Sequence, residues 1–244
     1  MKLEGKGAIV TGAGSGIGEA IAATFAAEGA QVVTVGRSGA KLEQAKQRAG
    51  ELSERLHPYA VDISNREGVA AMATWAAEKL GAIDILVNNA GMNVRKRSFA
   101  DVDPDDFEDV VKVNLNGTFY CIHSVLPGMR ERGDGLIINV SSTAGVRAAE
   151  VAGVPYNASK FGMSALSYSI GLEERDNGIR ACLICPGEVN TPILENRPVV
   201  PDAERRAKML QPEDLAQAAL MVATLHPRAS IPVMVVTPTM QRFA

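Results

Sequence analysis

Short apolar runs rich in valine and isoleucine alternate along this chain with longer segments whose apolar residues recur at helical spacing. The apolar runs predict buried strands over 7–11, 31–35, 58–61, 83–87, 135–140, 179–185 and 233–236. The segments between them predict helices near 16–28, 40–51, 66–79, 105–130, 156–176 and 213–225. This alternation predicts an α/β fold in which a doubly wound, seven-stranded, mostly parallel sheet is flanked by helices on both faces.

The chain of 244 residues is predicted to form one domain, 1–244, because no internal repeat and no linker rich in proline, glycine or serine divides it. Charged residues make up 22% of the sequence and the net charge is -3. Neither sign of charge dominates, so we expect no nucleic-acid partner and no anionic membrane surface. No apolar stretch approaches the length of a membrane span or a signal peptide, and we therefore expect a cytoplasmic protein.

The cysteines and histidines form no metal-binding pattern. Cys182 and Cys185 lie three apart in a predicted strand, where such residues point to opposite faces. The histidines are scattered, with no ligand spacing between them. We therefore expect no metal site.

Residues 11–18, with the sequence TGAGSGIG, connect the first predicted strand to the first predicted helix. Glycines allow the backbone to turn sharply there and to approach a pyrophosphate, while the free amides and the dipole of the helix start attract its charge. A tight strand-to-helix connection alone would also use glycines. The strand before the turn and the helix after it favour dinucleotide binding.

Tyr156 and Lys160 lie four residues apart at the start of a predicted helix, so their side chains leave the same face. An ammonium beside a phenol favours the phenolate, and we expect Lys160 to lower the pKa of Tyr156 below its usual value of about 10. Such a tyrosine can act as a general acid or base. The pair alone equally fits a tyrosine packed under a solvated lysine.

The glycines of the turn at 12, 16 and 18 are followed in order by Asn-Asn-Ala-Gly at 88–91, Tyr-x-x-x-Lys at 156–160 and Pro-Gly at 186–187. In this combination the chain resembles the compact, single-domain branch of the short-chain dehydrogenase/reductase (SDR) family, which has a Rossmann-like fold. The resemblance implies that the following residues contact a nicotinamide dinucleotide: Gly12, Ser15, Gly16, Ile17, Gly18, Arg37, Ser38, Asp62, Ile63, Asn89, Ala90, Gly91, Tyr156, Lys160, Pro186, Gly187, Val189 and Thr191.

The resemblance also implies the catalytic residues. Tyr156 exchanges a proton with the substrate oxygen, while Lys160 lowers the pKa of the tyrosine and holds the nicotinamide ribose. Ser142 hydrogen-bonds the substrate oxygen, and Ser141 is the less favoured candidate for this role. Asn114, which interrupts an apolar helical run, would hold a water next to the lysine.

The end of the second strand bears on the choice of cofactor. An acidic residue there binds the ribose hydroxyls of NAD, whereas an arginine suits the extra phosphate of NADP. This chain has Gly36 followed by Arg37, so NADP is favoured and NAD is the alternative. A plain surface arginine after a strand would look the same.

The predicted function is that of an NADP(H)-dependent carbonyl reductase, an oxidoreductase that transfers hydride between nicotinamide and a carbonyl or secondary alcohol. The alternatives are an NAD(H)-dependent dehydrogenase of a hydroxy acid, sugar or alcohol, an epimerase or dehydratase, and a non-catalytic dinucleotide-binding sensor or scaffold. The resemblance further implies a homodimer or homotetramer that pairs through helices 105–130 and 156–176. The Gly-Gly pair frequent near the end of family members is missing from the predicted tail, 237–244.

The substrate is a small molecule that the sequence does not name. Residues 188–211, of which 193–211 are charged and hold two prolines, predict a short substrate lid or else a plain surface excursion. Several charged residues lie in segments that could border the pocket, and one arginine among them could bind a substrate carboxylate: Arg95, Arg97, Arg147, Glu150, Glu188 and Arg197.

Overall fold

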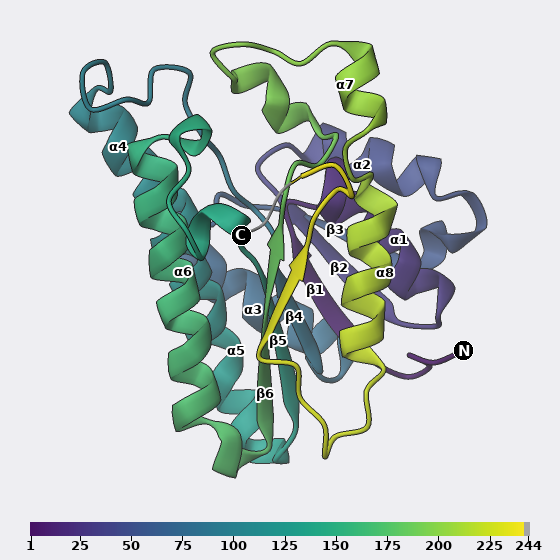
Figure 1. Ribbon diagram of the computed structural model, residues 1–244. Coiled ribbons are helices and arrows are strands. Elements are labelled where there is room, and N and C mark those ends of the chain that lie inside the picture. The colour runs from purple at the N-terminus through teal and green to yellow at the C-terminus, as the bar shows by residue number, and fades with distance from the viewer. Residues whose placement is uncertain (242–244) are drawn as a thin grey trace.

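The computed structural model describes residues 1–241 (Figure 1), so the last three residues of the predicted tail lie outside the described part. Its centre is one sheet in which all six strand pairings are parallel, in the order β3-β2-β1-β4-β5-β6-β7. The strands are β1 (Gly7–Thr11), β2 (Gln31–Gly36), β3 (Leu56–Ala60), β4 (Ile85–Asn88), β5 (Gly135–Val140), β6 (Ile179–Pro186) and β7 (Val233–Val236). The predicted doubly wound sheet is confirmed.

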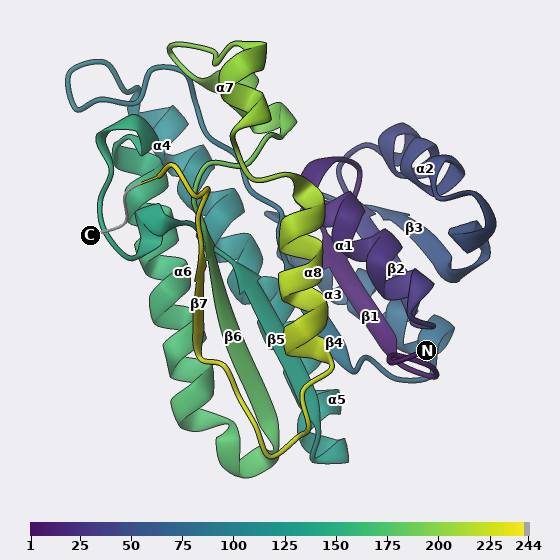
Figure 2. The same ribbon diagram turned by 45° about the vertical axis from the view of Figure 1, so that its right-hand side comes forward.

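The helices form a layer on each face of the sheet (Figures 1 and 2). They are α1 (Gly16–Ala27), α2 (Gly39–Arg48), α3 (Arg66–Leu80), α4 (Pro104–Val111), α5 (Thr118–Arg132), α6 (Val154–Glu173), α7 (Ala203–Ala207) and α8 (Pro212–Ala223). Alternate residues of the buried strands supply two cores. In β1, for example, Val10 packs in the core that contains Phe25 of α1 and Leu215 of α8, whereas Ile9 packs in the core that contains Met72 of α3.

The helix predicted over 105–130 is interrupted. A π-helical turn, Lys112–Gly117, separates α4 from α5. The turn carries Asn114, the residue that broke the apolar pattern of the sequence, and buries it completely. Single π-helical turns occur frequently at functional sites.

The carboxyl ends of the strands all lie at one edge of the sheet, at the top of Figure 1, where α7 also lies. In the sheet, β2 and β3 lie on one side of β1, and β4 to β7 lie on the other side. The strand order therefore reverses between β1 and β4. Open α/β sheets bind their ligands at such a switch point. The segment predicted as a lid crosses this edge, and a bridge between Val189 and Leu210 ties its two ends together.

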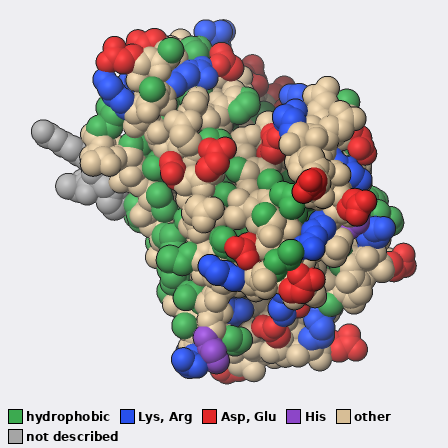
Figure 3. Space-filling model, turned by 90° about the vertical axis from the view of Figure 1, so that its right-hand side faces the viewer, with side chains coloured by type: hydrophobic (Ala, Val, Ile, Leu, Met, Phe, Trp, Pro, Cys, Tyr) green, Lys and Arg blue, Asp and Glu red, His purple; other side chains and the backbone are tan. Residues whose placement is uncertain are grey.

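The outer surface is unremarkable over α1, α2 and α8, where acidic and basic side chains are interspersed (Figure 3). Among the described helices, none combines the length and the apolar character that a membrane crossing needs.

Candidate active site

A cavity of about 380 Å³ lies at the carboxyl ends of the central strands. It brings together most of the residues predicted to bind a dinucleotide, from segments far apart in the sequence. Those that line it are Gly12, Ser15, Gly16, Ile17, Arg37, Asp62, Ile63, Asn89, Ala90, Gly91, Tyr156, Lys160 and Thr191.

The glycine-rich turn is shaped for close approach. Gly12 and Gly16 have φ values of 68° and 58°, which favour glycine. A Cβ on Gly12 would lie 2.9 Å from the Cα of Ala90, so a larger residue would fill the space beside the next strand end. Ser15 precedes α1 and makes no side-chain cap bond to the described residues of its first turn. The amides of that turn can therefore bind an anion, which is the fit expected for a pyrophosphate.

Gly18 does not line the cavity but packs beneath it. A Cβ there would lie 2.5 Å from the carbonyl oxygen of Gly12 and 2.5 Å from Nδ2 of Asn89. Asn89 in turn donates from Nδ2 to the carbonyl of Thr11 at 3.0 Å, and the amide of Ala90 donates to Thr11 Oγ1 at 3.0 Å. The turn and the end of β4 are thus held together by hydrogen bonds.

The end of β2, which the sequence predicted to contact the adenosine half of a dinucleotide, lies at this cavity. Gly36 and Arg37 both line the cavity, and no acidic side chain from β2 is present there. Ser38 lies outside the cavity, where its hydroxyl accepts a hydrogen bond from the amide of Lys41 at 3.3 Å and caps α2. Although burial opposes it, a hydrogen bond from the Ser64 amide and the nearby charge of Arg37 lower the pKa of Asp62.

The environment of Tyr156 differs from the prediction. Tyr156 is only partly buried as a residue, yet the protein atoms packed around its hydroxyl raise its pKa to about 12. A hydrogen bond with Ser142 and the charges of Arg197 and Arg97 oppose this effect. The predicted pKa below about 10 is therefore wrong for Tyr156 in this structure, because desolvation outweighs the hydrogen bond and the charges that lower the pKa.

Lys160 is buried, with 2% of its surface exposed, and its Nζ lies 5.5 Å from the centroid of the Tyr156 ring. Nζ donates a hydrogen bond to the carbonyl oxygen of Val140 at 3.0 Å. Burial lowers the pKa of Lys160 to about 8. The ammonium is therefore directed at the end of β5 rather than at the phenol oxygen.

Asn114 does not line the cavity. Its side chain forms two hydrogen bonds with the backbone of Met92, at 2.8 and 2.9 Å, and donates to Ser159 Oγ at 3.1 Å. It nevertheless lies close to Lys160: a Cβ on Gly91 would contact Oδ1 of Asn114 at 3.3 Å and Nζ of Lys160 at 3.7 Å. Gly91 therefore leaves a narrow space between the amide and the ammonium.

A second cavity of about 190 Å³ adjoins the first, and Tyr156 lines both. Four of the remaining predicted residues, Ser142, Pro186, Gly187 and Val189, line this cavity instead. Ser142 accepts a hydrogen bond from the amide of Ala144 at 3.1 Å, whereas Ser141 donates to the carbonyl of Lys160 at 3.3 Å. Of the two serines, Ser142 is thus the one that bonds to Tyr156.

Several lining residues were not predicted. Val61, Met92, Val113, Val140, Pro192, Ile193 and Asn196 also line the first cavity. Val61 and Met92 are adjacent in the sequence to the predicted residues Asp62 and Gly91. The motifs at these strand ends could therefore have indicated that Val61 and Met92 line the cavity. Ile193 and Asn196 come from the segment that crosses the edge of the sheet, and their sequence carries no motif that would place them.

The comparisons with known proteins bear on this arrangement. A family model described as short chain dehydrogenase matches residues 6–199. The chain belongs to the short-chain dehydrogenase family. It is therefore an NAD(P)-dependent oxidoreductase with the Rossmann-like fold of that family.

Relatives within the family align over nearly the whole chain. An uncharacterized oxidoreductase of Staphylococcus saprophyticus is 35% identical over 90% of this chain and 92% of its own. Among solved structures, a 3-ketoacyl-(acyl-carrier-protein) reductase from Brucella melitensis complexed with NADH is 32% identical, with a TM-score of 0.88 over 97% of this chain and 98% of that one. A closed form of serine dehydrogenase complexed with NADP+ is 31% identical, with a TM-score of 0.87 over 97% and 96%.

Proposed function

We propose that this protein is an NADP(H)-dependent carbonyl reductase in which Tyr156 is the general acid in reduction and the general base in oxidation. The observation that carries the proposal is that Tyr156 lies where two cavities meet. One cavity has the glycines, Arg37 and Lys160 that suit a dinucleotide, and the other is a separate space for the molecule that reacts with it. Relatives of similar fold are named for a ketoacyl group and for serine, both of which belong to carbonyl and alcohol pairs.

The cofactor, when bound, supplies or accepts a hydride. The protein's part is to orient the two molecules and to manage one proton. Because the pKa of Tyr156 is about 12, the phenol keeps its proton at neutral pH and can donate it to a carbonyl oxygen. Ser142, which bonds to the tyrosine, would hold that oxygen, and Lys160 would hold the nicotinamide ribose.

The proton that Tyr156 gives up must be replaced from solvent. Asn114 and Lys160 lie on either side of Gly91, and a water held between them would extend the path to the tyrosine. The fully buried amide is fixed by three hydrogen bonds, so it would hold such a water without rearrangement.

NADP is proposed over NAD because Arg37 lines the adenosine end of the cavity while Gly36 takes the position where an acid would bind ribose hydroxyls. The NADH complex of the Brucella reductase keeps NAD as the alternative. The segment 188–211 is proposed as a lid, since Thr191 and Asn196 line the first cavity and Glu188 and Arg197 line the second.

The test of the mechanism is Tyr156→Phe, which removes the hydroxyl and retains the ring. Its turnover should fall by about 10²–10⁴-fold, the range for loss of a general acid. Binding of NADPH, measured by fluorescence titration, should stay within about threefold of wild type. A variant that binds the dinucleotide and still turns over normally would refute the proposed role.

A homo-oligomer is proposed because α5 and α6 expose large apolar side chains, namely Phe119, Phe161, Tyr168 and Leu172. Leu172 has 74% of its surface exposed, which is costly on a free helix face. The molar mass of the purified protein from light scattering should be at least twice the 25.8 kDa of one chain. A monomer at micromolar concentration would contradict pairing through these helices.

A further inference from the structure

Two arginines, Arg97 and Arg197, line the second cavity together with Tyr156. Resting on the proposed function, we propose that the substrate of this enzyme is a small oxo acid or hydroxy acid whose carboxylate binds at Arg97 and Arg197. The two residues come from different loops, one before α4 and one from the segment 188–211. One small molecule bound in this cavity could therefore contact both the arginines that would bind its carboxylate and the tyrosine that would donate the proton.

Arg97 is built into the protein rather than left on its surface. Only 7% of it is exposed, and its side-chain stem packs on Gly153, where a Cβ would lie 2.4 Å from Cγ of the arginine. Its carbonyl accepts a hydrogen bond at 2.9 Å from the amide of Val154, which lies two residues before Tyr156 on α6. The guanidinium is thus held in a fixed position relative to the catalytic tyrosine.

The guanidinium of Arg97 has no acidic partner among the described residues. Nη1 donates to the carbonyl of Val151 at 3.2 Å and Nη2 to the carbonyl of Asn196, while Nε has no partner there. Carbonyl oxygens carry no net charge. Burying an ion without a counterion is costly, and here burial together with the charge of Arg197 lowers the pKa of Arg97. An anionic ligand would remove this cost.

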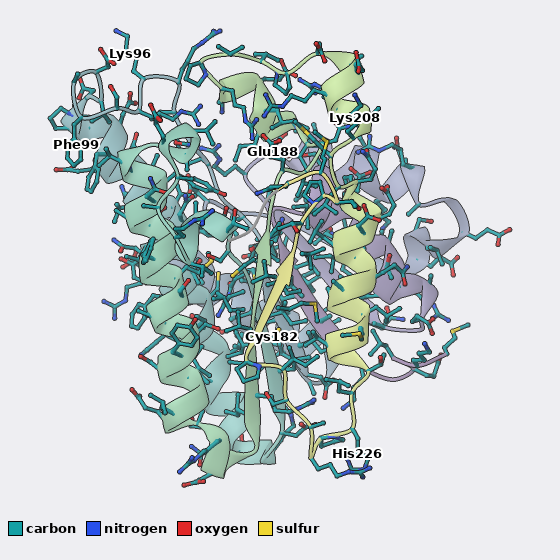
Figure 4. The ribbon with its side chains drawn as sticks, viewed as in Figure 1. Lys96, Phe99, Cys182, Glu188, Lys208 and His226 are labelled. Atoms are coloured by element: carbon teal, nitrogen blue, oxygen red, sulfur yellow. The ribbon has the colours of Figure 1, made fainter. Side chains whose placement is uncertain are left out.

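Among the described residues, the acidic partner of Arg197 is one that a second arginine shares. Nη1 of Arg197 lies 2.7 Å from Glu188 Oε1, and the same carboxylate also binds Arg205 at 3.0 Å. Glu188 lies at the carboxyl end of the sheet beneath α7 (Figure 4). The charged residues that line the cavity are Arg97, Arg197 and Glu188, so its lining carries an excess of positive charge.

The charge and size of the cavity favour a small anion. Both arginines act electrostatically on the hydroxyl of Tyr156, so their charge reaches the reacting atoms. A volume of about 190 Å³ is below the roughly 300–1,000 Å³ of pockets for drug-sized ligands. Arginine is suited to carboxylates because its planar N–H groups can donate to both oxygens.

The approach to the cavity is also basic. Arg97 and Arg197 line, on their other side, an outer cavity of about 580 Å³ that includes Arg95, Lys96 and Arg205. Asp101 and Glu150 line it too, so cations exceed anions there. Lys96 projects at this same end of the molecule (Figure 4). An anion entering from solvent would be attracted along this route.

The reaction balances without any further reagent. In reduction, the carbonyl carbon of the oxo acid gains the hydride and its oxygen gains the proton of Tyr156. The dinucleotide is oxidised, the oxo acid becomes a hydroxy acid, and solvent returns one proton to the tyrosine. The carboxylate is unchanged and serves only for binding.

The experiment compares short 2-, 3- and 4-oxo acids with their methyl esters, which keep the carbonyl and remove the charge. In the wild-type enzyme with NADPH, the best acid should exceed its ester in kcat/KM by at least tenfold. Arg197→Met removes a charge that also acts on Tyr156, so both substrates can be affected, but kcat/KM should fall at least tenfold more for the acid than for the ester. Arg97→Lys, which keeps the charge but loses the planar N–H groups, should lower the acid's kcat/KM by a smaller factor.

A matched control is Arg175→Met, since Arg175 is an exposed arginine remote from both cavities, and it should behave as wild type. A second readout is the melting temperature with NADP+ present, which the product hydroxy acid should raise in wild type and not in Arg197→Met. Esters that react as well as acids, or an Arg197 variant that loses both equally, would overturn the carboxylate site and leave the reductase intact. No turnover of any carbonyl by an enzyme that binds NADPH would instead refute the proposed function.

Discussion

The buried ammonium of Lys160 should cost the folded protein stability, and the size of this cost can be worked out. Its pKa is about 8 in the folded protein against an ordinary value of 10.5, and burial is the main cause. At about 1.4 kcal/mol for each pKa unit, burial of the charge costs about 3 kcal/mol at pH 7. Lys160→Met removes the charge but retains much of the volume, and it leaves the carbonyl of Val140 without its 3.0 Å hydrogen bond. That loss costs about 1–3 kcal/mol.

The variant should therefore be as stable as wild type at pH 7 or more stable by up to about 2 kcal/mol, while losing activity. The decisive readout is the pH dependence. Between pH 8 and 10.5 the unfolded chain holds a proton on Lys160 that the folded chain has released, so stability rises with pH. Wild type should gain about 2 kcal/mol relative to the variant between pH 7 and 9.5. Urea denaturation of both proteins across this range measures the difference. A constant difference, or one that moves the other way, would refute a lowered pKa for Lys160.

Two further substitutions test the cofactor cavity. For Arg37→Ala, the ratio of kcat/KM with NADPH to that with NADH should fall by about tenfold or more, as expected for loss of a charged hydrogen bond, and an unchanged ratio would exclude Arg37 as the phosphate ligand. Gly18→Ala would place a Cβ 2.5 Å from the carbonyl of Gly12, so it should weaken NADPH binding at least tenfold in a fluorescence titration. Gly14→Ala in the same turn, whose Cβ would have the Cβ of Lys41 at 3.2 Å as its nearest neighbour, should be milder, and equal losses in both would contradict the packing argument.

The sheet could be predicted because most of its strands, such as β1, β4 and β5, are largely apolar and buried, and a parallel sheet covered on both faces requires that pattern. The interrupted helix between Pro104 and Arg132 could not be predicted in detail. Its apolar spacing continues on both sides, so periodicity alone favours one helix. The only sign of the π-helical turn was Asn114, a polar residue that proves to be buried and bonded to the backbone of Met92.

The sequence could predict which residues gather at the candidate site when they belong to a motif near a strand end. It could not predict which loop residues lie together there. The glycine-rich turn, the end of β4 and the Tyr156 helix all follow strands, so the fold places them together. Arg97 and Arg197 belong to two loops whose positions no sequence pattern gives. Both could be named as pocket candidates from the sequence, but only the structure places them on the same cavity.

The pKa of Tyr156 illustrates the same limit and has a consequence for the reaction. Spacing places Lys160 on its face of the helix, yet the amount of protein around the hydroxyl is a property of the whole fold. In the structure the charges that lower this pKa are those of Arg197 and Arg97, which both line the second cavity. A carboxylate bound to these arginines would offset their charge, so the pKa of Tyr156 would rise further. Because the pKa of Tyr156 is already about 12, the phenol is protonated at neutral pH both before and after an acidic substrate binds, so it enters the reduction with its proton in place.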